Sequence, residues 1–166
     1  MMQVALGGTG IQLSDGATNI MPVGPHRPTD EKSLTKSQIA ENRRAVYHAW
    51  RLNFTDIQHS LKQGYYQGWD LHPTQFPLRY AAVYSFFLES LESTSRRLKS
   101  FMEKAAQVTL VGGIFDDAAT GQGLLNYFLR GISCGAITEK DAEAAGLTLE
   151  EIQTRSFKKI LQGRQL

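Results

Sequence analysis

The sequence predicts an α/β fold that is mostly helical by residue count. Two short apolar segments, each bounded by glycine or proline, read as β-strands, and a long amphipathic helical pattern follows each of them. This β–loop–α–β–loop–α order is typical of parallel strands joined through helices, and the remaining residues predict a helical tail.

The first half of the chain carries both predicted strands. Residues 4–6 and 11–13 are apolar runs separated by a glycine-rich turn, which fits either one interrupted strand or a strand pair. Residues 14–30 are irregular by composition. A helix is expected from Thr35 or Ser37, either of which can act as its N-cap, to Gly64 as its C-cap. Residues 65–71 then predict a buried strand.

The second half is predicted to be helical. Pro77 suits the first turn of a helix that runs to about residue 106, and residues 108–111 are expected to be extended. Asp116 or Asp117 can cap a helix through residue 133, and Thr138 and Thr148 can cap two shorter ones. The predicted division is therefore 1–107 for the strand–helix units and 108–166 for a helical lid.

Composition excludes several classes of protein. The formal net charge is +2, and the nearest basic cluster, Arg96, Arg97 and Lys99, reads as the solvated face of a helix, so nucleic-acid binding is not expected. No apolar run reaches the roughly 18 residues of a membrane span. A single cysteine, Cys134, permits no internal disulfide and favours the cytoplasm.

Two parallel strands cannot form a stable sheet alone, because both edges and one face would be open. We therefore expect the rest of the sheet to come from an upstream segment, another chain, or exchange between copies. The large apolar faces of the helices predict association in the same way.

Three motifs occur in a fixed order: LSDGATN at residues 13–19, GWDLHPTQ at 68–75 and VGGIFD at 111–116. Together they resemble the C-terminal part of citrate lyase β-subunit-like aldolases, relatives of malyl-CoA lyases and malate synthases. The resemblance implies the last two βα units of a (β/α)8 (TIM) barrel followed by a C-terminal lid. It implies that the first six strands, the Mg²⁺ ligands and the substrate-carboxylate arginine precede this chain, which holds no metal ligand itself.

The resemblance also suggests roles for single residues. Asp116, or Asp117 in its place, would act as acid or base next to a carbonyl or thioester, and the alternative is a helix N-cap. Asp15 would position substrate or a metal-bound water, or hold a turn. Asp70 would point toward the site or pair with an arginine, and His72 would bind substrate or order its loop. The remaining candidates for substrate binding are Asn19 and Gln75.

The sequence thus predicts a fragment of a Mg²⁺-dependent carbon–carbon lyase for 2-oxo acids or acyl-CoA thioesters, inactive alone. The alternative is a non-catalytic helical module that oligomerises. His48 and His59 are eleven residues apart and read as surface residues rather than as a metal pair.

Overall fold

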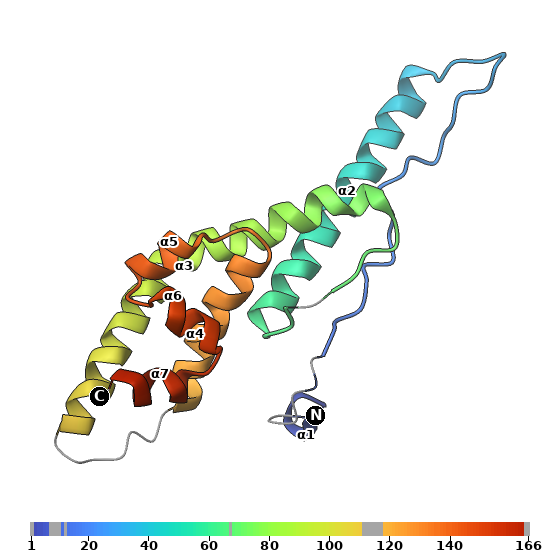
Figure 1. Cartoon of the computed structure of the whole chain (residues 1–166). Coiled ribbons are helices and arrows are strands. Elements are labelled where there is room, and N and C mark those ends of the chain that lie inside the picture. Colours follow the sequence, from blue (N-terminus) through green and yellow to red (C-terminus); the bar gives the residue numbers. More distant parts are fainter. Residues whose placement is uncertain (1, 7–10, 12, 67, 111–117, 165–166) are drawn as a thin grey trace. The chain divides into compact units, whose positions relative to one another are not determined.

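The computed structural model describes the chain except for residues 1, 7–10, 12, 67, 111–117 and 165–166 (Figure 1). The described part is built from helices. They are α1 (Met2–Leu6), α2 (Lys36–Lys62), the 3-10 turn η1 (Pro73–Gln75), α3 (Phe76–Leu110), α4 (Ala118–Ser133), α5 (Glu139–Ala144), α6 (Leu149–Thr154) and α7 (Phe157–Arg164).

The predicted α/β fold, with two units of a (β/α)8 barrel, is wrong for the residues that the structure describes, because none of them forms a β-strand. Residues 4–6 lie in α1, residues 108–110 lie in α3, and the described residues of 11–13 and 65–71 are not helix or strand. A short apolar run is compatible with either a helix or a strand, so the pattern alone does not distinguish them. A strand forms only where a neighbouring strand supplies its hydrogen bonds.

Helix α2 begins and ends where the sequence predicts. The Thr35 hydroxyl accepts from the Gln38 N–H, and the Gln38 side chain accepts from the Thr35 N–H at 2.9 Å. At the other end, Gly64 has φ +83°, a left-handed conformation that glycine adopts without strain. There the N–H groups of Gly64 and Tyr65 bond the carbonyls of Leu61 and Ser60, which is the Schellman pattern.

Internal contacts divide the chain into an N-terminal unit, Met1–Phe86, and a C-terminal unit, Phe87–Leu166, so the division falls within α3. The sequence-based boundary at 107/108 stays a prediction. In the N-terminal unit, α2 packs on the first turns of α3. The apolar contacts there come from Ile57, Leu61 and Ala82, with Phe54, Val83 and Phe86 packed against them.

The C-terminal unit has a larger apolar core, formed by the later part of α3 with α4 to α7. Its most deeply buried side chains are Phe87, Leu98, Leu125, Phe128, Leu147, Phe157 and Ile160. The Phe157 ring lies so close to Gly121 that a Cβ there would overlap it, which explains a glycine inside α4. The predicted caps Thr138 and Thr148 are confirmed, each within a capping box.

Candidate functional site

Gln75 connects two of the three sequence motifs, residues 13–19 and 68–75. Its side chain is fully buried. The amide oxygen accepts from the N–H groups of Leu71, at 2.8 Å, and His72, at 3.2 Å, while the amide nitrogen donates to the Thr18 carbonyl at 2.9 Å. One side chain therefore satisfies backbone groups of both loops and holds them together.

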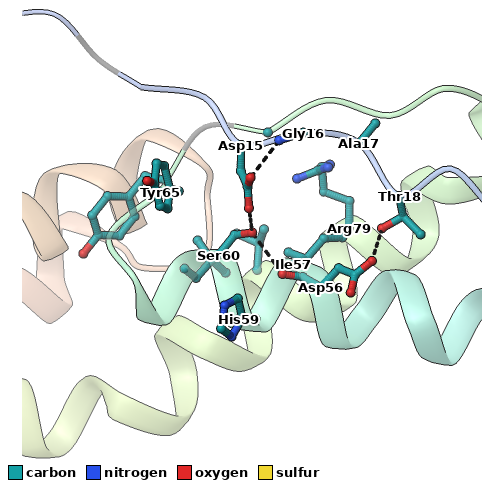
Figure 2. A pocket seen from close by; sticks show the side chains of 14 residues that line it. Asp15, Gly16, Ala17, Thr18, Asp56, Ile57, His59, Ser60, Tyr65 and Arg79 are labelled. Carbon is teal, nitrogen blue, oxygen red and sulfur yellow. Dashed lines mark hydrogen bonds between the residues drawn. The ribbon is translucent and has the colours of Figure 1, made fainter. Parts of the chain in front are cut away.

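A cavity of about 300 Å³ lies beside these loops in the N-terminal unit (Figure 2). One wall comes from residues 15–18, a second from the last turns of α2, and a third from Arg79 of α3. The polar and aromatic residues that line it are Asp15, Thr18, Asp56, His59, Ser60, Tyr65, Tyr66 and Arg79.

Asp15 lines this cavity and is held by two donors, the Ser60 hydroxyl and the N–H of Gly16 at 2.8 Å (Figure 2). The Ser60 hydroxyl is the main cause of a lowered pKa of the Asp15 carboxyl, and the Gly16 N–H adds to it. An acid–base catalyst at neutral pH needs a pKa near that pH. Asp15 is therefore suited to accept hydrogen bonds as a carboxylate rather than to transfer a proton.

A second carboxylate, Asp56, lies one turn before Ser60 on α2. It accepts from the Thr18 hydroxyl at 2.7 Å, so α2 is bonded to the 13–19 loop at two points (Figure 2). Asp56, His59 and Ser60 follow each other at i, i+3 and i+4, which places them on one face of the helix. His59 is exposed, as expected of a surface residue, and also lines the cavity with them.

Asp70 forms an ion pair with Arg79, whose Nε lies 2.5 Å from Asp70 Oδ2. The Asp70 side chain is only 4% exposed, and within the described structure its Oδ1 has no hydrogen-bond partner. Arg79 also donates to the Trp69 carbonyl, at 3.0 Å. Its guanidinium lies against Gly68, where a Cβ would be 2.7 Å from Nη1, so a larger residue there would require the Arg79 side chain to move. Of the two roles considered for Asp70, pairing with an arginine is the observed one.

The other predicted site residues have different positions. His72 caps the η1 turn, with Nδ1 accepting from the Thr74 N–H at 3.2 Å, which is the loop-ordering role. Asn19 is exposed and does not line the cavity. Asp116 and Asp117 lie outside the described residues, so their predicted role as acid or base stays a prediction.

Sequence reasoning did not identify Arg79, Asp56 or Ser60 as site residues. The helical spacing of Asp56, His59 and Ser60 was a usable signal, because polar residues at i, i+3 and i+4 share a face. Arg79 had no such signal, since its approach to Asp70 and Gly68 depends on how the 68–75 loop folds back onto α3.

Within the described part of the chain, no three His, Cys, Asp or Glu side chains are grouped so that they could hold a metal ion. Among the described helices, none is both long enough and apolar enough to cross a membrane.

Comparison with known proteins gives a family but no function. No curated protein and no solved structure matches the chain. A family model matches residues 1–160, nearly the whole length. The chain therefore belongs to the family described as domain of unknown function DUF6986.

Proposed function

We propose that this chain is the C-terminal portion of a carbon–carbon lyase that acts on 2-oxo acids or acyl-CoA thioesters, and that it is inactive alone. The observation that carries the proposal is the link made by Gln75 between the 13–19 and 68–75 loops. These are two of the three motifs on which the resemblance to citrate lyase β-subunit-like aldolases rests.

The candidate residues have three different roles under this proposal. Gln75, His72 and the Asp70–Arg79 pair shape the 68–75 loop, because each forms hydrogen bonds within that loop or with its neighbour. Asp15 faces the cavity as a carboxylate and would accept hydrogen bonds from substrate hydroxyl groups, with Asn19 further along the same loop. Asp116 or Asp117 would supply the acid–base step.

What the chain lacks under this proposal must come from elsewhere. Mg²⁺, which in such enzymes stabilises an enolate, would be held by residues of an N-terminal segment or another copy. The exposed apolar side chains of the N-terminal unit, Trp50, Trp69 and Tyr80 among them, are consistent with such a partner.

The test compares the chain alone with the chain joined to any open reading frame directly upstream of it. Cleavage of a panel of oxo acids and acyl-CoA thioesters is measured with Mg²⁺ present. We expect activity only in the joined protein, abolished by Asp116→Asn or Asp117→Asn and retained in the control Asp30→Asn. A joined, folded protein that cleaves no member of the panel would contradict the proposal.

A helical assembly module is the second candidate, and one observation on α2 favours it. Ile39, Trp50, Ile57 and Leu61 recur at helical spacing, so they form one apolar stripe. Its C-terminal half is buried, with Ile57 and Leu61 each 5% exposed, whereas Ile39 is 47% and Trp50 36% exposed. An apolar stripe covered over half its length is typical of a helix that packs against another subunit.

Light scattering at several concentrations tests this candidate. A self-associating module predicts a mass above 18.5 kDa for one chain that falls in the double variant Ile39→Ser, Trp50→Ser. Val23→Ser, another exposed apolar side chain off the stripe, is the control and should leave the mass unchanged. A monomer at all concentrations would contradict the module, as would a mass that does not change in the double variant.

A further inference from the structure

A groove of about 490 Å³ lies in the C-terminal unit and is lined from α3 and α4. Its charged residues are three cations, Arg96, Arg97 and Lys104, and no described residue in its lining is acidic. The rest of the lining comprises the hydroxyl residues Ser93, Ser100 and Thr120 and the apolar residues Phe101 and Leu124. We propose that this groove binds a small phosphorylated molecule with an apolar body.

The α3 side of the groove is one continuous helical stripe. Residues 93, 96, 97, 100, 101 and 104 are spaced by three, four, seven, eight and eleven positions from the first, so their side chains share a face. Arg96 Nη2 lies 3.8 Å from Glu92 Oε1, and the two side chains are 75% and 88% exposed. Such an exposed pair is weak in water, so it leaves the Arg96 guanidinium able to exchange Glu92 for a ligand anion.

The composition of the lining favours a phosphate over a carboxylate. A phosphate monoester carries about −1.5 to −2 charges at pH 7 and presents three acceptor oxygens, which matches several cations and hydroxyl donors better than one carboxylate does. Guanidinium groups bind phosphate through two parallel hydrogen bonds, while lysine contributes a point charge. Leu124 is buried and Phe101 half-buried, so they offer an apolar surface beside the cations.

The cavity of the N-terminal unit and the groove between α3 and α4 differ in charge, and this difference assigns them different ligands. The cavity of the N-terminal unit contains two carboxylates, Asp15 and Asp56, which would repel a phosphate. The sequence interpretation grouped Arg96, Arg97 and Lys99 as one solvated face. All three are exposed, but Lys99 lines a different cavity, with Glu103 and Arg164, which makes it a matched control on the same helix.

The inference is tested by NMR titration of the full chain at low salt with hexyl phosphate, hexanoate, hexanol and inorganic pyrophosphate. We expect hexyl phosphate to bind most tightly, with the largest amide shifts at Arg97, Lys104 and Leu124. The double variant Arg97→Gln, Lys104→Gln should weaken binding about tenfold, and Lys99→Gln should leave it unchanged. Far-UV circular dichroism checks that each variant keeps its helices.

Several results would overturn the inference. Equal affinity for hexanoate would remove the preference for phosphate, and equal affinity for pyrophosphate would remove the role of the apolar body. Equal weakening by Lys99→Gln would show general charge attraction rather than a site. A single-stranded RNA that binds more tightly than hexyl phosphate and shifts the same amides would assign the groove to nucleic acid. The outcome does not depend on whether the proposed lyase activity is found.

Discussion

The two units of this chain bury their apolar side chains to different extents. Among the described residues, fifteen of the buried hydrophobic side chains belong to the C-terminal unit and four to the N-terminal unit. Exposed large hydrophobic side chains show the opposite distribution, with thirteen in the N-terminal unit and two in the C-terminal unit. The C-terminal unit therefore resembles a closed helical domain, and the N-terminal unit presents surface that suits a further partner.

The units also differ in their buried polar groups. Thr18, Asn53 and Gln75 are buried, and all three belong to the N-terminal unit. In that unit, hydrogen bonds from a few side chains fix irregular segments that have little apolar surface of their own. In the C-terminal unit, side-chain packing specifies the structure. The N-terminal unit should therefore be destabilised most by loss of a buried hydrogen-bonding side chain, and the C-terminal unit by loss of a buried apolar one.

Phe128→Ala should have the largest effect on stability. Phe128 is fully buried in the C-terminal core, and removing such a ring leaves a cavity, so we expect a loss of about 3–5 kcal/mol in the free energy of unfolding. Trp69→Ala is the control in the N-terminal unit. Trp69 is 55% exposed, so about 0.5 kcal/mol or less is expected. Urea denaturation followed by circular dichroism measures both, and equal losses would contradict the comparison.

Gln75→Ala should have the next largest effect, confined to the N-terminal unit. The variant removes the partner of the part-buried N–H of Leu71 and of the buried carbonyl of Thr18, which predicts a loss of about 2 kcal/mol. Hydrogen exchange should show faster exchange in residues 13–20 and 68–75, with the C-terminal core unchanged. The exposed Gln153→Ala is the control. Unchanged exchange in both loops would show that Gln75 does not join them.

The sequence was informative about helices and misleading about strands. The end of a helix is set by one or two residues that satisfy its free backbone groups. The sequence shows such capping residues at Thr35, Gly64, Thr138 and Thr148. A strand depends on a neighbour that local sequence does not contain. Residues 65–71 have a strand-like pattern, and no strand among the described residues pairs with them.

The candidate site shows the same contrast between features set by local sequence and features that depend on distant residues. Asp15 and Gln75 could be identified because each lies in a motif. The pairing of Asp70 with an arginine could be anticipated as one of two roles, whereas its partner Arg79 could not, because it is nine residues further along the chain and approaches only when the loop folds back. The fit of Arg79 against Gly68 is a tertiary contact of the same kind.

Thr148→Ala tests the contribution of local capping in the C-terminal unit. Thr148 and Glu151 form a capping box at the start of α6, and the variant removes the hydroxyl that accepts from the Glu151 N–H. A loss of about 1 kcal/mol is expected, which is smaller than the effect of either buried side chain. Thr148→Ser keeps the hydroxyl and should retain most of the stability. Equal losses in the two variants would contradict a capping role.

The smallest effect expected concerns pH and the N-terminal unit. The pKa of Asp15 is lowered in the folded chain, mainly by the Ser60 hydroxyl, so its contribution to stability is present above the unfolded value of about 3.9. That contribution is lost as the pH falls through the lower, folded pKa. Ser60→Ala should raise the pKa of Asp15 toward its ordinary value, as measured by carboxyl ¹³C NMR titration.

Thr55→Ala is the matched control for this titration, because the Thr55 hydroxyl donates to the Arg51 carbonyl and not to Asp15. If Ser60→Ala leaves the pKa of Asp15 unchanged, the Ser60 hydroxyl does not stabilise the Asp15 carboxylate. If the pKa rises as expected, Asp15 accepts hydrogen bonds as a carboxylate at neutral pH. Any proton transfer in the proposed reaction must then come from another residue.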